Sequence, residues 1–383
     1  MALGRHVDGL VDAYYGPAEL ADRAAEGPPR APAELAELAR RLIADLDAGA
    51  DPDLVASRRA WLRGQVVGLA TTAHKLAGEP IGYVEEVLSC YGVRPAWVPE
   101  DDLAAAHRRL DDVLPGTGAL AERFVAWRDA QTVPVERLGP AIASLADDFR
   151  ERTDRAFGLP DGEHVDFELT HAQPWSGFNY YLGGLRSRVA VNTDLPVPST
   201  VLGHLVAHEA YPGHHTEHTR KEVGLVQRRR HLEETIFCVG TPQCLLAEGL
   251  ADLGLEVLLG LRPEPVLASH FAPLGLRYDA EVVAAVATAG EALAAVRGNV
   301  ALLLHDEGAD LDDGVEYAMR WGLQDRARAA KTVQFLTDPT WRAYISCYVE
   351  GLPLCRRFTA GDPARFERLL SEQLLPSDLV AAA

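Results

Sequence analysis

The residues with the clearest chemical potential lie between positions 204 and 218, where the sequence reads HLVAHEAYPGHHTEH. Five of the 13 histidines of the chain fall within this stretch. Neutral imidazole is the commonest protein ligand of transition metals, so this density indicates a metal site. Pro212 and Gly213 interrupt the stretch, however, whereas the helix of an H-E-x-x-H zinc motif is continuous.

His208 and Glu209 begin such a motif, in which the second histidine normally follows four positions after the first and the glutamate acts as general base. Here the next histidine is His214, six positions on, which a straight helix would rotate by about 240° relative to His208. Pro212 cannot donate the helical hydrogen bond to the carbonyl of His208, and Gly213 tolerates unusual backbone angles. We therefore expect a bulge that returns His214 to the face of His208.

Other pairings of these histidines need no distortion of the helix. His204 with His208, and His214 with His218, are each four residues apart and would share a face. A shift of one residue after the bulge would make His215 the second ligand in place of His214. Histidines of this kind are also common as polar surface or capping residues.

The third metal ligand is expected in the apolar segment PQCLLAEGLADLGLEVLLG, at 242–260. Glu248 lies within it, and a buried carboxylate is costly unless it is paired or binds a metal. Asp252, one helical turn later, is placed to accept a hydrogen bond from the distal nitrogen of a ligand histidine. Glu256 is the alternative ligand, and the three acidic residues could also form an exposed stripe.

Hydrolysis of an amide needs a group that stabilises the developing oxyanion. Tyr344 and Tyr348 are four residues apart on one predicted helical face and are candidates, although such tyrosines often serve only in packing. His171, beside a predicted strand, is a third candidate.

The segment 186–193 is predicted to be a strand that pairs with an extended substrate backbone. Arg186 and Arg188 in this strand would bind a substrate carboxylate, which would indicate a carboxypeptidase. Charged residues of a strand also commonly just face solvent.

The hydrophobic pattern predicts a mainly α-helical protein with a small β-sheet beside the histidine helix. Three- and four-residue spacing of apolar residues predicts helices through the first 150 or so residues and again after the histidines. Strands are expected at 164–172 and 186–196, separated by an aromatic and glycine-rich connection at 173–184. We divide the chain into a helical region, 1–155, and a catalytic region, 156–383, or treat both as one continuous domain.

Composition limits the partners and the compartment. The chain has 383 residues and a net charge of −19, which argues against nucleic acid or an anionic membrane as a partner. No apolar run reaches the roughly 18 residues of a membrane span, and the first residues lack the pattern of a secretory signal. The five cysteines are an odd number without a C-x-x-C pair, which predicts reduced thiols in a cytoplasmic protein.

Several of these segments resemble the bacterial "domain of unknown function 885" family. The similar pieces are HEAYPGHH at 208–215, AEGLADLGLE at 247–256, and a tail that contains YVEGLPL and FERLLSEQLLPSDL. The family is related to thermolysin-type metallopeptidases and shares its helical architecture with carboxypeptidase Taq. The resemblance implies a zincin-like fold of the gluzincin type, with His208, His214 and Glu248 as zinc ligands and Glu209 as base. A tryptophan usual in the family is Leu250 in this chain.

The sequence therefore predicts a zinc-dependent hydrolase. Its expected reaction is that of a metallopeptidase that cleaves a peptide or small amide by attack of water, with Glu209 as general base. A second interpretation is a metalloenzyme of other chemistry that acts on a small metabolite in a biosynthetic pathway. Iron or manganese could then replace Zn²⁺, because two histidines and a carboxylate also form the ligand set of non-haem iron enzymes. A third interpretation is a non-catalytic helical binding protein.

Overall fold

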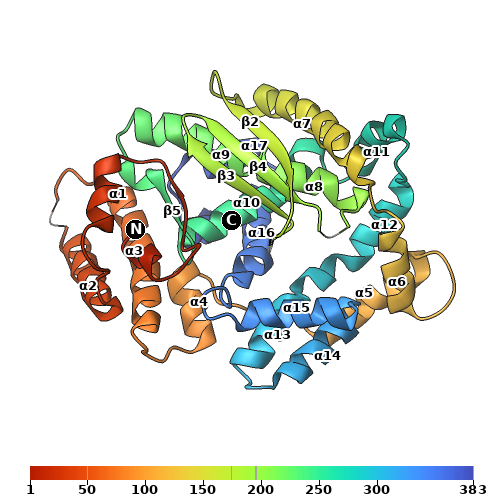
Figure 1. The fold of residues 1–383 in the computed structure, drawn as a ribbon, viewed down its shortest axis with the longest axis horizontal. Helices are drawn as coiled ribbons and strands as arrows, with labels where there is room; N and C mark the ends of the chain where they lie inside the picture. Colours follow the sequence, from red (N-terminus) through yellow and green to blue (C-terminus); the bar gives the residue numbers. More distant parts are fainter. Residues whose placement is uncertain (50, 174, 195, 383) are drawn as a thin grey trace.

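The computed structural model describes residues 1–49, 51–173, 175–194 and 196–382, and it is mainly α-helical with two small β-sheets (Figure 1). The predicted mainly α class is thus confirmed. Among the described residues, no helix is long and apolar enough to cross a membrane.

The described part of the first 157 residues is mainly helical, as the apolar spacing predicts, but it begins with a short strand that was not predicted. The elements are β1 (Val11–Tyr14), α1 (Ala18–Ala25), α2 (Pro32–Ala48), α3 (Ala56–Leu76), α4 (Tyr83–Tyr91), α5 (Glu100–Val113), α6 (Leu120–Asp129) and α7 (Val135–Phe157).

The larger sheet follows α7 and contains β2 (His164–Thr170), β3 (Gly177–Gly183) and β4 (Arg186–Asn192). The strand order is β2-β4-β3, with β4 parallel to β2 and antiparallel to β3. Strands begin where they were predicted, at 164 and 186, but they end at Thr170 and Asn192, before the predicted ends at 172 and 196, and residue 195 lies outside the described residues. The expected connection at 173–184 contains β3. Its phenylalanine and tyrosines favour a strand, and the flanking glycines obscured this preference in the sequence.

The position of β4 contradicts the expectation that segment 186–193 pairs with a substrate. β4 is the central strand, and both of its edges are hydrogen-bonded to neighbouring strands. The strand at the edge of the sheet nearest the histidines is β3, because β3 contacts the two histidine helices described next.

The histidine stretch forms two helices, α8 (Ser199–Glu209) and α9 (His214–Lys221), and α9 continues into a π-helical segment at Glu222–Gln227. β5 (Ile236–Cys238) then pairs antiparallel with β1, so that the first strand of the chain lies beside this region. The remaining helices are α10 (Pro242–Leu259), α11 (Glu264–Phe271), α12 (Ala280–Gly290), α13 (Val296–His305), α14 (Leu311–Gly322), α15 (Arg326–Thr337), α16 (Ile345–Thr359), α17 (Pro363–Ser371) and α18 (Pro376–Ala382).

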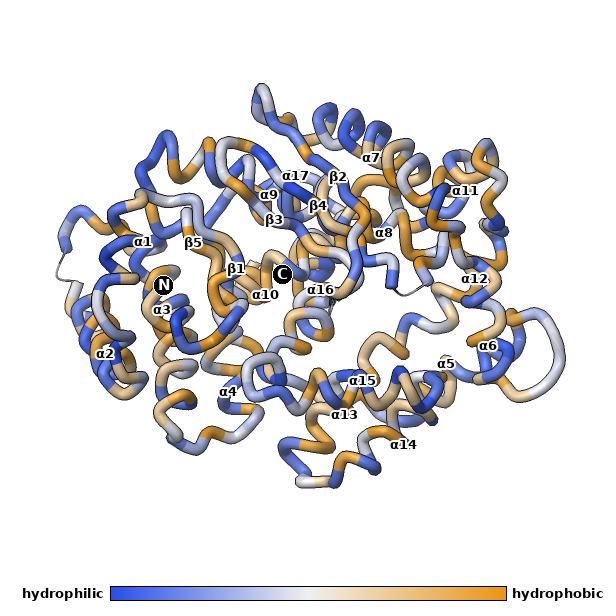
Figure 2. The backbone as a smooth tube through the Cα atoms, in the orientation of Figure 1, coloured by the Kyte–Doolittle hydropathy of each residue, from blue (hydrophilic) through white to orange (hydrophobic). Residues whose placement is uncertain are grey.

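Helix α10 is the centre of the core. Every residue from Pro242 to Ala251 is buried, and hydrophobic residues gather around this helix in the middle of the molecule (Figure 2). α16 crosses α10 closely at two glycines. A Cβ placed at Gly249 of α10 would lie only 2.5 Å from the carbonyl oxygen of Gly351 of α16. This close crossing positions the side chains that α10 and α16 contribute to the site.

The two expected regions share one hydrophobic core. Tyr83 and Val87 of α4 belong to the same buried cluster as Leu245 and Leu250 of α10. α1–α4 lie on one side of the molecule in Figure 1, whereas α5 and α6 lie on the other side, where α5 packs against α12. α7 also runs across the expected boundary at 155. Residues of both expected regions are thus buried together in one cluster.

Candidate metal centre and pocket

The histidine helix is broken in two, instead of bulged as the sequence suggested. α8 ends at Glu209, the Tyr211–Pro212 peptide bond is cis, and α9 begins at His214. The N–H of Gly213 donates to the carbonyl of Ala207 at 2.8 Å. A Cβ at position 213 would collide with the carbonyl oxygen of the first metal-ligand candidate, so only glycine fits there.

A buried polar network holds the break against the sheet. The Glu163 carboxylate accepts hydrogen bonds from the Tyr211 hydroxyl at 2.7 Å and from Nε2 of His215 at 2.8 Å. Arg150 pairs with the same carboxylate at 2.6 Å, and Nδ1 of His215 lies 2.8 Å from the Ser187 hydroxyl of β4. His215 therefore joins α9 to β4, and the structure does not bring it to the other histidines as an alternative ligand.

His208, His214 and Glu248 converge as the expected ligands should. The two Nε2 atoms are 3.1 Å apart, and the Glu248 carboxylate oxygens lie 3.4 Å from Nε2 of His208 and 3.6 Å from Nε2 of His214. The side chains are 11%, 13% and 7% exposed, in the same order. The break therefore places the second histidine on the face of the first, as the spacing argument required.

The donor set fits a transition metal. One oxygen of Glu248, Oε2, is buried without any hydrogen-bond partner, which is costly unless a cation completes its environment. Burial lowers the pKa of His214 to about 4, partly offset by the charge of Glu248, so its imidazole is neutral and able to bind a metal.

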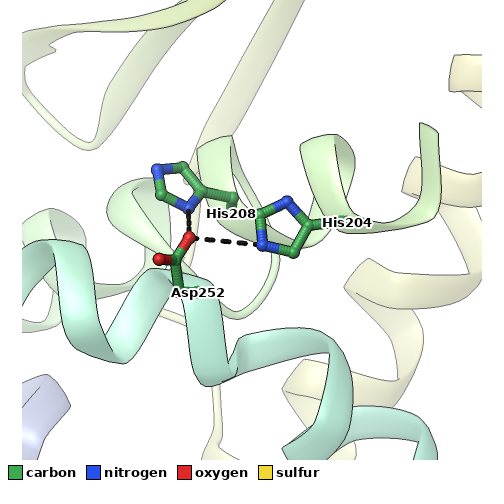
Figure 3. Close-up of side chains that lie close together, drawn as sticks. All are labelled: His204, His208 and Asp252. Carbon is green, nitrogen blue, oxygen red and sulfur yellow. Dashed lines mark hydrogen bonds and ion pairs between the residues drawn. The ribbon is translucent and has the colours of Figure 1, made fainter. Parts of the chain in front are cut away.

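Asp252 lies within hydrogen-bond distance of His208. Its Oδ1 atom lies 2.9 Å from Nδ1 of His208 and 3.2 Å from Nε2 of His204, so the carboxylate sits between the two rings (Figure 3). Burial alone would raise the pKa of Asp252, but the hydrogen bonds from both histidines outweigh it and lower the pKa. Nε2 of His208 is thereby left to face the other two ligands.

His204, His208 and Asp252 form a second group whose ligand atoms are close enough to hold a metal. In this group, however, one oxygen of Asp252 already lies within hydrogen-bond distance of both rings. The His204 side chain is also 49% exposed. The geometry therefore favours the buried group that contains His214.

A pocket opens beside the candidate ligands. Its lining residues come from β1, β3, α8, α9, β5, α10, α16 and the segments next to them: Asp12, Gly177, Phe178, Asn179, His208, Glu209, His214, His218, Phe237, Val239, Glu248, Tyr344 and Tyr348.

Glu209 presents its carboxylate to this pocket. The Asn179 side chain donates to the backbone carbonyl of Glu209, and Gly177 of β3 leaves room for the carboxylate, which a Cβ there would approach to 3.4 Å. Burial, partly offset by the charge of His208, raises the pKa of Glu209 to about 7. Its position and its pKa suit a group that accepts a proton.

The two candidate tyrosines lie at the same pocket. The Tyr344 hydroxyl donates to Oε1 of Glu248 at 2.9 Å, and the Tyr348 hydroxyl donates to that of Tyr344 at 3.3 Å. Tyr348 is 36% exposed, so its hydroxyl group is accessible from the pocket.

Two other candidates lie away from the described pocket lining. Glu256 pairs with Arg356 of α16 at 2.9 Å, which accounts for its position on α10 without a metal. The His171 ring is 72% exposed, and its Nδ1 lies 3.0 Å from the hydroxyl of Thr193.

Arg186 and Arg188 also lie outside the described lining of the pocket. Their side chains are half exposed and pair with acidic residues of β2, Asp166 at 3.3 Å and Glu168 at 3.6 Å. These cross-strand ion pairs account for both arginines without a substrate.

Sequence reasoning left three polar residues of the pocket out of the preferred site: Asp12, Asn179 and His218. Asp12 reaches it from β1, and His218 reaches it from α9, stacked on Tyr181 with ring centroids 4.7 Å apart. The HTEH spacing indicated His218 only as a ligand in an alternative pair. No local pattern could indicate Asp12, because the pairing of β1 with β5 alone brings it to the site.

Comparison with known proteins identifies the fold but no function. No protein-family model matches the chain, and no functionally curated protein matches it. The fold is similar to the solved structure of a "putative lipoprotein" from Colwellia psychrerythraea, with 16% identity and a TM-score of 0.56 over 90% of this chain. A "putative lipoprotein of unknown function" from Shewanella oneidensis gives 14% identity and a TM-score of 0.51 over 89%. The chain spans 65% and 68% of the lengths of those two proteins.

Proposed function

We propose that this chain is a zinc-dependent hydrolase, and specifically a metallopeptidase that cleaves an amide bond. The observation that carries the proposal is the convergence of His208, His214 and Glu248 on one buried point. His208 and His214 are separated by a break in the helix that requires glycine at position 213. Glu248 has a buried oxygen without a hydrogen-bond partner. A surface cluster of histidines would need neither feature.

The roles of the neighbouring residues follow from their positions. When bound, Zn²⁺ would supply a Lewis acid and increase the acidity of a water molecule. Glu209 would take a proton from the attacking water. The Tyr348 hydroxyl, which donates to Tyr344 in the free site, would turn its proton to the developing oxyanion instead. Asp252 would hold the His208 ring.

The proposed fold is zincin-like, and we propose a relation to the "domain of unknown function 885" family. The support is the HEAYPGHH stretch together with Glu248 and Asp252 at their observed positions. α8 ends and α9 begins at the pocket, and β3 lies beside both helices, where an extended peptide could bind. The substrate would be a peptide or a small amide. A cytoplasmic location, without nucleic acid or membrane partners, stays a prediction from composition.

Metal analysis of purified protein tests the proposal. We expect one zinc ion per chain, loss of zinc in His208→Ala, and retention of zinc in Glu209→Gln with hydrolysis of a peptide library reduced by about 10²–10⁴-fold. His171→Ala is the matched control, because His171 is exposed and lies away from the described pocket lining. It should keep both metal and activity.

Other outcomes would redirect or reject the proposal. Stoichiometric iron or manganese without hydrolysis would favour the metalloenzyme of other chemistry, because the ligand set is the same. Absence of any metal after repletion, in the wild type as well as in the variants, would reject a metal site and leave a helical binding protein.

A further inference from the structure

Asp12 enters the pocket because the strand that carries it is irregular. In the β1–β5 pair, Val11 lies opposite Cys238 and Ala13 lies opposite Phe237, so Asp12 is the extra residue on β1. A bulge of this kind redirects a side chain and is common next to active sites. Asp12 is thereby directed toward the pocket, where Phe237 of β5 lies as well.

The Asp12 carboxylate has no counter-charge. Among the described residues, no hydrogen bond or ion pair reaches it, and the residues that line the pocket include no lysine or arginine. Burial and the negative charges of Glu248 and Glu209 raise the pKa of Asp12 to about 7. The carboxylate is therefore destabilised in its charged form until a cation lies beside it.

A single metal ion does not supply that cation. A divalent ion on neutral histidines is balanced by Glu248 and by the base Glu209, which leaves the charge of Asp12 in excess. Asp252 keeps its own negative charge, but the hydrogen bonds from two histidines stabilise that charge, so Asp252 needs no further cation. Among the described residues, Asp12 belongs to no group of side chains close enough to chelate a second metal. The remaining source of positive charge is the substrate.

The chemistry of the pocket indicates which positive group it accepts. The pocket is lined by three carboxylates and by no lysine or arginine, so it disfavours a negatively charged substrate carboxylate. Arg186 and Arg188, which were expected to bind such a group, pair with acidic residues of β2 instead. The α-ammonium group of an amino-terminal residue is separated from the scissile carbonyl by one carbon atom, so one pocket can hold both. A lysine side chain would need a long apolar channel, and the large apolar lining residues are only Phe178, Phe237 and Val239.

We propose that Asp12 binds the free α-ammonium group of the substrate, so that the enzyme removes residues from the amino terminus of peptides. The inference rests on the proposed hydrolase function of the same site. Asp12 then determines specificity: an acylated amino terminus lacks the charge and leaves the carboxylate unpaired.

Binding of two chelating probes to the zinc-loaded full chain tests the inference. The probes are leucine hydroxamic acid and its N-acetyl derivative, which differ in the ammonium group, and their affinities are measured by calorimetry. We expect the wild type to bind the free amine at least about 10-fold more tightly, since a hydrogen-bonded ion pair of this kind typically contributes a factor of 10 to 100. Asp12→Asn should remove this difference without weakening the N-acetyl probe. Asp8→Asn, an exposed aspartate of the same segment, is the control.

Equal affinity of the two probes for the wild type would overturn the inference, whether or not the Asp12→Asn variant folds. The same holds if Asp12→Asn keeps the preference for the amine. If the wild type binds zinc and has the same affinity for the two probes, the hydrolase proposal stands and only the role of Asp12 is wrong. If the chain binds neither zinc nor a probe, both proposals are wrong. Leucine p-nitroanilide and its N-acetyl form give a second readout, with kcat/KM expected to follow the same order.

Discussion

At the scale of single residues, the proposed ligands are distinct from the groups that would orient them. His208 uses its two ring nitrogens differently, since Nδ1 faces Asp252 while Nε2 faces His214 and Glu248. A carboxylate on the distal nitrogen fixes both the tautomer and the angle of a ligand ring. Asp252 also contacts His204, so the structure contains two overlapping sets of potential ligands, which variants can distinguish.

Asp252→Asn should weaken zinc binding by about 10–100-fold, because the ring of His208 loses its charged acceptor. His204→Ala should leave the affinity nearly unchanged, since His204 is half exposed and Asp252 keeps its hydrogen bond to His208 without it. Competition with a chromophoric chelator measures both values. If His204→Ala loses as much affinity as Asp252→Asn, the metal lies on His204, His208 and Asp252 instead.

At the scale of elements, the sequence indicated that the histidine segment cannot be one regular helix. It did not indicate which kind of irregularity the segment contains. The six-residue spacing of His208 and His214 is incompatible with one straight face, which is a local property and can be calculated. The actual break depends on Glu163 and Ser187, which precede it by more than 20 positions and hold it through Tyr211 and His215. Contacts at such separations have no local pattern, so a bulge was predicted where the helix is broken.

Gly213→Ala should therefore disrupt the proposed metal site. The added Cβ would meet backbone carbonyls, which cannot move as the end of a side chain can, so we expect a loss of at least about 2 kcal/mol in the free energy of unfolding. Zinc binding should fall in parallel. Denaturant unfolding and metal analysis measure the two effects.

Gly224→Ala is the matched control, because a Cβ at that position meets nothing within 4 Å. It should keep zinc and most of the stability. A Gly213→Ala protein with full zinc content would show that the turn can open without moving His214, and the break would then not be what positions the second ligand.

At the scale of the whole molecule, the site draws on both halves of the chain. The mainly helical class follows from periodicity, and spacing made His208 and His214 candidate ligands. The full ligand set with Glu248 came from the family resemblance. Asp12 was missed because its place depends on the pairing of β1 with β5, more than 220 residues apart in sequence. The division at 155 was uncertain for the same reason, since apolar periodicity shows which helix faces are buried but not which helices bury them.

The shared core predicts a single cooperative unfolding transition, and Gly68 offers a way to test it. Gly68 of α3 packs so closely on the segment before α10 that a Cβ would collide with the carbonyl oxygen of Gly240 and lie 3.2 Å from that of Cys90. Gly68→Ala should shift the whole transition to lower temperature, with circular dichroism and tryptophan fluorescence still coincident. Gly139→Ala, on the exposed face of α7 with nothing near its Cβ, should cause no loss of stability. If the protein instead unfolds in two steps and Gly68→Ala moves only one of them, regions 1–155 and 156–383 are separate domains, and the pocket that joins Asp12 to the histidines lies at their interface.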